Sequence, residues 1–452
     1  MQILVAEIGS TTTVVNAFAH VNCPNPVFLG QGQAPTTVGA GDVALGLEAA
    51  IADLKERVGP LSWSEMYACS SAAGGLKMTV HGLVYDMTVK AAREAALGAG
   101  AIIRLVTAGE LGARDLTQIK EINPNIILLA GGVDYGEKNT IIANARHLAA
   151  LKLSVPVVFA GNTAAWEEVQ EILAKEQIPC LKVDNVYPRI DQLQVEPARR
   201  AIQALFEKNI VKAPGMAGIR KLVTSPILPT PGAVMETARL LQETMGDLVL
   251  IDVGGATTDV HSVTEGSEEI QRLLLSPEPF AKRTVEGDLG VYVNVSHVAA
   301  LLDPQAVKES FGCTIAELLE KKEPIPASRQ DREFTSLLTE TAVQTAMKRH
   351  AGSITYLYGP TGRVTVAQGK DLTKVKWIIG TGGALTRLPG GEEILTRVRQ
   401  EPGSRDLLPS TDAQVLLDHD YIIAACGVLA QRHPQAALKL IQTSLKYHPE
   451  GN

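Results

Sequence analysis

Hydrophobic and polar positions alternate along the chain in a way that predicts an α/β protein. An apolar run from Ile3 to Ile8 leads through a short polar turn into a second run from Val14 to Ala19, which predicts a β-hairpin. A helix is expected over 42–58 and a strand over 65–69. Tight turns between such strands and helices are typical of α/β folds.

The region from about residue 86 to residue 214 has a more regular rhythm of helices and short buried strands. Its strand candidates are 102–106, 125–130, 155–160 and 178–183. Its helix candidates are 88–97, 137–151, 163–175 and 196–208. Because such alternation places each helix between two parallel strands, this region predicts a self-contained module with a parallel, doubly wound sheet.

The rest of the chain returns to strands that end in glycine-rich turns. A helix over 233–245 precedes the apolar run Leu248 to Val253, and a charged helical stretch follows at about 304–349. A strand over 375–379 leads into a third glycine-rich turn. The last predicted helices are 421–431 and 435–447.

Composition narrows the function classes. The 452 residues carry a formal net charge of −7, which argues against a nonspecific nucleic-acid binder because such binding depends on clustered Lys and Arg. No uninterrupted apolar stretch approaches the roughly 20 residues that a membrane-spanning helix needs. No basic leader precedes the first strand. The five cysteines are dispersed, as in proteins of a reducing cytosol. We therefore expect a cytoplasmic protein that binds neither nucleic acid nor membrane.

Two glycine-rich turns repeat one pattern. Residues 7–13 and residues 252–258 both read acidic, apolar, Gly, two small residues, Thr, Thr, and both come at the end of a hydrophobic strand. A repeat over this distance indicates a duplication of whole lobes and not a solenoid. One such turn could be an ordinary hairpin turn, but two matched copies favour a shared binding role.

Each residue type in these turns suits phosphate binding. Glycine lets backbone N–H groups approach an anion closely, and Ser or Thr hydroxyls donate to phosphate oxygens. An acidic residue beside a polyphosphate would repel it unless a hydrated Mg²⁺ lies between them. No GxxxxGK[ST] pattern competes for a nucleotide. The residues predicted to bind phosphate are Gly9, Ser10, Thr11, Thr12, Thr13, Gly254, Gly255, Ala256, Thr257 and Thr258.

Together with the glycines after the strand at 375–379, these turns resemble the phosphate-1, phosphate-2 and adenosine motifs of the ASKHA superfamily of acetate and sugar kinases, heat-shock chaperones and actin. The resemblance implies two duplicated RNase-H-like lobes with ATP and Mg²⁺ between them. It also implies that the adenosine motif, Gly380, Thr381, Gly382 and Gly383, binds the nucleoside. It covers about two thirds of the chain and leaves out the parallel α/β module.

On this resemblance the chain divides into three parts. Residues 1–85 form the first ATPase lobe, residues 86–214 an inserted parallel α/β domain, and residues 215–452 the second ATPase lobe. The helices near 421–447 are expected to pack back on the first lobe. The insert lacks the D-x-H-x-x-G mark of cobalamin-binding modules, so we expect it to dock a partner or to swivel.

A second resemblance is carried by five segments, 7–13, 69–76, 129–134, 252–259 and 285–290, and covers essentially the whole chain. In these segments the chain is similar to the MutL/GlmL family, which is named for glutamate mutase and is distinct from the mismatch-repair protein of similar name. The resemblance implies an ATPase that reactivates or services an adenosylcobalamin-dependent mutase or aminomutase by releasing damaged cobalamin. A homodimer is compatible with the sequence, which leaves the oligomeric state open.

The acidic residues of these motifs receive roles from the same resemblance. Asp252 and Glu7 are expected to act in catalysis and to hold Mg²⁺, although the superfamily usually has Asp at the position of Glu7. Asp259 would position or deprotonate the attacking water, or else cap a turn. Glu286 would complete the catalytic site and Asp288 the metal site, or both would form an acidic surface turn.

Three rival functions stay open on the same fold. A small-molecule kinase would need a base opposite the terminal phosphate, and Asp259 could serve as that base. An electron-donating activator would need a metal cluster bridged between subunits, which the dispersed cysteines disfavour. A scaffold of the actin type would bind ATP without turnover.

Overall fold

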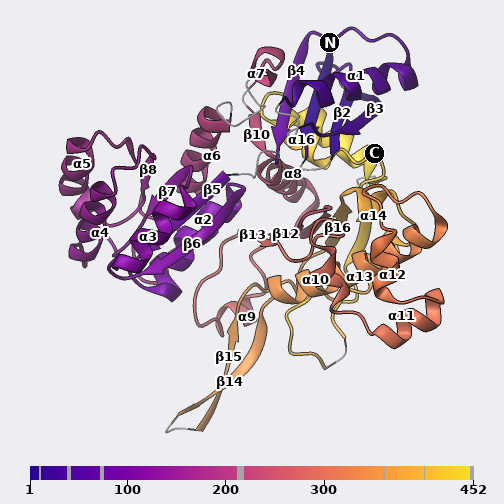
Figure 1. Cartoon of the computed structure of the whole chain (residues 1–452). Coiled ribbons are helices and arrows are strands. Elements are labelled where there is room, and N and C mark those ends of the chain that lie inside the picture. Colours follow the sequence, from indigo (N-terminus) through magenta and orange to yellow (C-terminus); the bar gives the residue numbers. More distant parts are fainter. Residues whose placement is uncertain are drawn as a thin grey trace.

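The computed structural model describes residues 1–9, 12–37, 42–71, 76–210, 218–225, 227–359, 362–401 and 403–447. Within these ranges it contains three five-stranded sheets and one two-stranded hairpin, which confirms the predicted α/β class. In Figure 1 one sheet with its helices lies to the left of two other lobes, and the hairpin projects from the lower lobe. No helix in the described ranges is long and apolar enough to cross a bilayer.

The first lobe is a mixed sheet with strand order β10-β4-β1-β2-β3. Strands β1 (Gln2–Ile8), β2 (Thr12–Ala19) and β3 (Val27–Pro35) form an antiparallel meander. Strand β4 (Glu65–Ser70) pairs with β1 in parallel, and β10 (Ile227–Pro229) pairs with β4 in parallel. The predicted hairpin is therefore confirmed, and the sheet is completed by a strand that lies far along the chain.

The second lobe repeats this plan with strand order β13-β12-β11-β16-β17. Strands β11 (Leu248–Val253), β12 (Thr258–Val263) and β13 (Ala281–Glu286) are antiparallel. Strands β16 (Trp377–Thr381) and β17 (Gln414–Leu417) extend the sheet in parallel. Counted within each lobe, the order and directions of the five strands are the same, as a duplication requires.

The insert is a parallel sheet with strand order β6-β5-β7-β8-β9. This is the doubly wound order in which the second strand lies outside the first. Its strands are β5 (Leu76–Gly82), β6 (Ala101–Ala108), β7 (Ile126–Leu129), β8 (Val157–Phe159) and β9 (Cys180–Lys182). Its helices are α2 (Lys90–Gly98), α3 (Ala113–Ile122), α4 (Asn139–Ala150), α5 (Trp166–Lys175) and α6 (Glu196–Ile210).

The strand pairings place the start of the insert and the end of the first lobe at other residues than those predicted. β5 pairs with β6 and β7, so the sheet of the insert begins at Leu76 and not at residue 86. β10 belongs to the sheet of the first lobe, although it follows residue 215, where the second lobe was expected to start. The insert therefore interrupts the first lobe between its fourth and fifth strands.

The second lobe also carries several short helices and the hairpin. The hairpin, β14 (Ser353–Gly359) and β15 (Gly362–Gln368), was not predicted. Isolated bridges join it to the rest of the lobe at Ser353 and Ala367, near its base. The other α-helices in the part of the chain that the structure describes are α1 (Ala44–Val58), α7 (Ile219–Leu222), α8 (Thr230–Met245), α9 (Glu268–Gln271), α10 (Val295–Ala299), α11 (Pro304–Phe311), α12 (Ile315–Glu320), α13 (Arg329–His350), α14 (Gly383–Thr386), α15 (Gly391–Thr396), α16 (Ile423–Ala430) and α17 (Pro434–Ser444).

Helices α8 and α16 form the joint between the two lobes. One buried cluster contains residues of both helices together with first-lobe and second-lobe strand residues, so the lobes share this part of the core. The two helices lie so close at Gly427 that a Cβ there would be 1.8 Å from the Ala233 carbonyl oxygen, so this contact requires glycine. The Thr237 hydroxyl donates to the Ile423 carbonyl oxygen at 2.7 Å. The C-terminal helices thus pack against the first lobe.

Candidate active site

The two repeated turns have the same internal geometry. In the first lobe the Gly9 amide donates to the Thr12 carbonyl oxygen at 3.0 Å. In the second lobe the Gly254 amide donates to the Thr257 carbonyl oxygen at 2.9 Å. A Cβ at Gly9 would lie only 2.7 Å from the Thr12 carbonyl oxygen, so this turn requires glycine. The sequence repeat is therefore also a repeat of structure.

The last threonine of each turn braces the turn instead of facing outward. Thr13 and Thr258 are both fully buried. The Thr258 hydroxyl donates to the Leu289 carbonyl oxygen at 2.7 Å, and the Thr13 hydroxyl lies 2.9 Å from the Thr36 hydroxyl. Both hydroxyls therefore have partners within the protein, and the predicted binding of Thr13 and Thr258 to phosphate stays a prediction. Ser10 and Thr11 lie outside the described residues.

A cleft of about 660 Å³ lies between the two turns. Both lobes and the insert contribute to its walls. Helix α14 and the loop before α16 close further parts of it. The predicted residues that line the cleft are Glu7, Gly9, Thr12, Asp252, Gly254, Gly255, Ala256, Thr257, Asp259 and Gly383.

Two acidic side chains from equivalent strand positions face this cleft. Glu7 is the last but one residue of β1, and Asp252 is the last but one residue of β11. Burial, together with the charges of Asp252 and Asp418, raises the pKa of Glu7 to about 8. Burial and the charge of Asp259 raise the pKa of Asp252 to about 7. The cleft therefore brings together two acidic groups whose burial and repulsion by neighbouring acids favour their protonated forms in the free protein.

This acidic pair fits a divalent cation. Among the described residues, no hydrogen-bond donor satisfies the carboxylate of Glu7 or of Asp252. A bound cation would offset the burial and the repulsion that together raise both pKa values. No group of three or more His, Cys, Asp or Glu side chains suited to a metal occurs within the described ranges. One or two carboxylates are nevertheless the usual protein share of a Mg²⁺ site whose other ligands are water and phosphate.

Asp259 lines the cleft but is already held by a cation. Its Oδ1 accepts a hydrogen bond from Arg283 Nη2 at 3.1 Å, and its Oδ2 accepts one from the Thr257 hydroxyl at 3.3 Å. Arg283 Nη1 donates to the Leu97 carbonyl oxygen at the end of α2 at 3.0 Å. Asp259 is therefore fixed in orientation and connected to the insert.

Glu286 and Asp288 are engaged elsewhere. Arg349 Nη1 donates to Glu286 Oε2 and to Asp288 Oδ1, each at 2.7 Å, and Arg349 Nη2 donates to Asp288 Oδ2 at 2.9 Å. Their neighbours Val285 and Gly287 line the cleft in their place. The structure does not bring these two acids together with Glu7 and Asp252, and their predicted roles stay predictions.

The adenosine motif lies directly against the second turn. Gly382 has a φ of 91°, and a Cβ there would lie 2.4 Å from the Val253 carbonyl oxygen, so the close approach requires glycine. Gly383 lines the cleft. Gly380 is packed under Leu395, and Thr381 is buried. Of the four residues of the motif, only Gly383 lines the cleft.

A protein-family comparison identifies the chain. The family model described as MutL protein matches residues 3–445. The chain belongs to the MutL family. The curated Protein MutL of Clostridium tetanomorphum is 36% identical over 464 residues, and the match covers 98% of each chain. The resemblance drawn from the sequence motifs is confirmed, and the family is the one associated with glutamate mutase.

Solved structures overlap this MutL-family chain only loosely. A diol dehydratase-reactivating factor in nucleotide-free form is 12% identical with a TM-score of 0.35, over 96% of this chain and 99% of its own. The activator of the 2-hydroxyisocaproyl-CoA dehydratase from Clostridium difficile, with bound ADPNP, is 9% identical with a TM-score of 0.31, over 100% of both chains.

Asp418 of this MutL-family chain is a site residue that the sequence motifs did not single out. Asp418 is fully buried. Its Oδ2 accepts hydrogen bonds at 2.9 Å from the Thr381 hydroxyl and from the amides of Ile422 and Ile423, which begin α16. Asp418 therefore joins the adenosine motif to the helix between the lobes. Because the N-cap position of α16 is occupied by Ile422 and not by Asp418, no local capping signal pointed to this residue.

Two other cleft residues, Arg387 and Tyr421, have no local sequence signal. Arg387 Nη2 donates to Gln31 Oε1 in the first lobe at 2.8 Å, across 356 residues of chain. Tyr421 lines the cleft with a φ of 54°, and the charge of Glu7 followed by burial raises its pKa. Contacts of this kind depend on how the lobes meet, so no local pattern predicts them.

The motif at 131–134 in the insert is accounted for by internal bonds. Asp134 Oδ1 accepts hydrogen bonds from the Thr163 amide at 3.0 Å and from Asn185 Nδ2 at 3.0 Å. Gly132 has a φ of 70°, and a Cβ there would lie 2.1 Å from the Glu137 carbonyl oxygen. This motif therefore joins the loops that follow the carboxyl ends of β7, β8 and β9.

Proposed function

We propose that this MutL-family protein binds Mg-ATP between its two lobes, hydrolyses it, and uses the resulting change in shape to service an adenosylcobalamin-dependent mutase. The observation that carries the ATP part is the matched pair of turns. Each has the same glycine-anchored bond, and each places an acidic residue, Glu7 or Asp252, at the shared cleft. A hairpin turn without a ligand role would not need two facing copies.

The residues of the cleft divide the work of hydrolysis. The backbone of the two turns would bind the phosphates, and Glu7 and Asp252 would hold Mg²⁺ through carboxylate oxygens or water. When bound, Mg²⁺ neutralises charge on the phosphate oxygens. Because a carboxylate is a weak base at neutral pH, Asp259 would orient the attacking water rather than remove its proton. The water oxygen bonds to the γ-phosphorus as the bond to the β–γ bridging oxygen breaks, which gives ADP, phosphate and a proton released to solvent.

The joint between the lobes would convert this chemistry into movement. Nucleotide contacts on both lobes favour a closed arrangement around α8 and α16, and loss of the terminal phosphate removes part of them. Moving a two-state equilibrium from 1:99 to 99:1 takes roughly 5.5 kcal/mol of differential binding. What supports the mutase as partner is membership of the glutamate-mutase-associated family.

The test is Mg-ATP hydrolysis by the purified chain, alone and with a mutase whose cobalamin has been inactivated. We expect turnover that rises when the blocked mutase is added. Asp252→Asn should lower it by at least about 100-fold, because it removes a charge that faces the metal. Glu309→Gln is a matched control, since this acid is exposed on α11.

Each part of the proposal can fail separately. A chain that binds no ATP would overturn the whole proposal. ATP turnover that never responds to a cobalamin enzyme would remove the mutase and leave the ATPase. Transfer of labelled γ-phosphate to a metabolite would identify a kinase in its place.

A further inference from the structure

Strand β6 of the insert carries a β-bulge at Arg104. Along its pairing with β5, Met78 lies opposite Ile103 and Thr79 lies opposite Leu105, so Arg104 is the extra residue. β6 is also the edge strand of its sheet. Bulges bend a strand and redirect a side chain, and they occur often beside active sites.

The edge strand with this bulge forms one wall of the cleft between the lobes. Gly100, Ile102 and Arg104 line the cleft together with Glu7 and Asp252. The wall is fixed at its start. Gly100 has a φ of 89°, and a Cβ there would lie 2.9 Å from the Cβ of Pro229 at the end of β10. Arg104 therefore reaches the cleft from the insert while the acidic pair comes from the lobes.

The other cationic residues of the cleft already have partners. Arg283 is paired with Asp259, and Arg387 with Gln31. Lys322 Nζ donates to the Thr335 hydroxyl at 2.6 Å, and Arg332 Nη2 donates to the Ala327 carbonyl oxygen at 2.8 Å.

Arg104 differs from these four cations. Like Arg332 and Arg387 it is exposed, but no ion pair or side-chain hydrogen bond joins it to any residue that the structure describes. It lines the same cleft as Glu7, Asp252 and Asp259 and makes no ion pair with any of the three. An unpaired guanidinium in a cleft that suits phosphate is free to bind phosphate oxygens.

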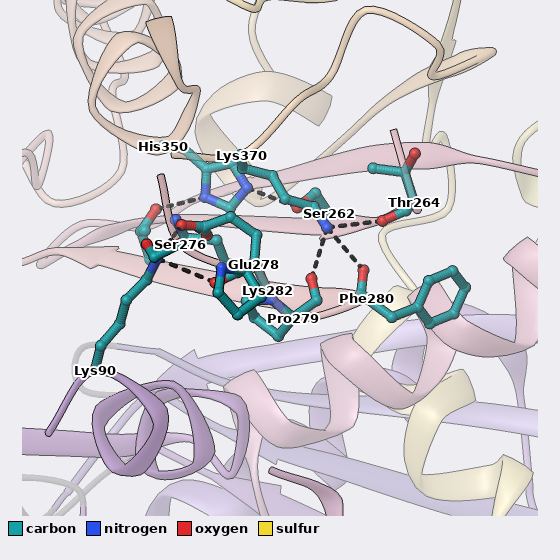
Figure 2. A network of polar contacts seen from close by, with 12 residues as sticks. Lys90, Ser262, Thr264, Ser276, Glu278, Pro279, Phe280, Lys282, His350 and Lys370 are labelled. Atoms are coloured by element: carbon teal, nitrogen blue, oxygen red, sulfur yellow. Dashed lines mark hydrogen bonds and ion pairs between the residues drawn. The ribbon is translucent and has the colours of Figure 1, made fainter. Parts of the chain in front are cut away.

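The helix before β6 is fastened to the second lobe at both ends. At its start, Lys90 Nζ donates to Ser276 Oγ at 2.9 Å and to Glu278 Oε1 at 2.5 Å, as Figure 2 shows. Glu278 also accepts a hydrogen bond from Lys282 at 2.8 Å. At its end, the Leu97 carbonyl oxygen accepts the bond from Arg283 described above. These bonds hold α2, and with it the start of the strand that carries Arg104, against the second lobe.

We propose that Arg104 is a catalytic residue that the insert supplies to the cleft, where its guanidinium contacts the terminal phosphate of ATP and stabilises the charge that develops during hydrolysis. This inference rests on the proposed ATPase function. In other phosphoryl-transfer enzymes an arginine in this role contributes several orders of magnitude to the rate.

The experiment compares Arg104→Ala and Arg104→Lys with the wild-type chain. Arg114→Ala is the matched control, because Arg114 is an exposed arginine on α3 of the same insert. Single-turnover hydrolysis and the affinities for ADP and for ADP with aluminium fluoride, which mimics the transferring phosphate, are measured for each. We expect Arg104→Ala to lower the rate by at least about 100-fold. We expect its ADP affinity to stay within about threefold and its aluminium fluoride complex to weaken far more. Lysine should restore little, because it lacks the planar fork.

The outcomes separate this proposal from the function on which it rests. A wild-type chain that binds no ATP would overturn the proposed function before any variant is compared. Wild-type turnover that is unchanged in Arg104→Ala would overturn the role of Arg104 alone. An equal loss of affinity for ADP and for its aluminium fluoride complex would also overturn it, since that result describes a ground-state or structural contact. Retained ADP binding shows that the variant is folded.

Discussion

Arg283 and Asp259 form a buried ion pair at the cleft, with 3.1 Å between Nη2 and Oδ1. Only 2% of the Arg283 side chain and 8% of the Asp259 side chain are exposed. Removing one member of a buried pair leaves the other charge without compensation, which costs about 3–5 kcal/mol. We expect Arg283→Ala to lower the free energy of unfolding by about 3 kcal/mol, measured by urea denaturation.

The control for this pair is Arg57→Ala, which breaks the exposed pair with Asp53 at 3.0 Å. That substitution should cost less than about 1 kcal/mol. Equal losses in the two variants would contradict the burial argument. Arg283→Ala should also slow ATP hydrolysis, since Asp259 would lose the bond that orients it.

Glu286 and Asp288 either form only a structural ion pair with Arg349 or take part in catalysis and metal binding as predicted. If Arg349 merely clasps these acids, Glu286→Gln and Asp288→Asn should leave ATP hydrolysis within about threefold of wild type, because neither side chain lines the cleft. Because Arg349 is 41% exposed, Arg349→Ala should cost about 1 kcal/mol of unfolding free energy or less. A collapse of hydrolysis in Asp288→Asn would instead support the predicted metal role.

The parts of the fold that depend on local pattern were predictable from the sequence. The apolar runs of β1 and β11 end in turns with the same residue pattern, and both turns have the same bond between Gly and Thr. The alternation in the insert likewise led to a parallel sheet. In each case neighbouring residues in the chain decide the structure.

The limits of the insert were not predictable, because strand pairing decides them. Nothing local shows that Leu76 begins a strand of the insert or that Ile227 begins the last strand of the first lobe. The residues of the candidate site divide in the same way, into those found from a local motif and those placed by packing. Glu7 and Asp252 were found from their motif, whereas Asp418 and Arg104 acquire their places only from the packing of the lobes and from a bulge.

His81 should make the chain sensitive to acid. It is fully buried in the insert, with Nδ1 2.8 Å from the Thr107 hydroxyl and Nε2 2.9 Å from the Thr79 hydroxyl. Burial lowers its pKa to about 4. The unfolded chain, with an ordinary pKa of about 6.5, therefore binds more protons between these pH values, and stability falls as pH is lowered through this window.

The loss attributable to His81 is at most roughly 3 kcal/mol between pH 6.5 and pH 4. We expect His81→Asn to be less stable at pH 7 but to lose less stability on acidification. The measurement is the free energy of unfolding against pH for both chains, since their difference isolates this group from the other carboxyls. Parallel curves would show that His81 does not titrate in this way.

Mg-ATP binding should release protons from the acidic pair. In the free protein Glu7 has a pKa of about 8 and Asp252 of about 7, so at neutral pH both are partly protonated. Because a cation binds the ionised carboxylates, binding expels these protons, more at pH 7 than at pH 9. Calorimetry in two buffers of different ionisation enthalpy counts them. Glu7→Gln should remove much of the release, Glu309→Gln should leave it unchanged, and equal release from all three chains would place the metal away from Glu7.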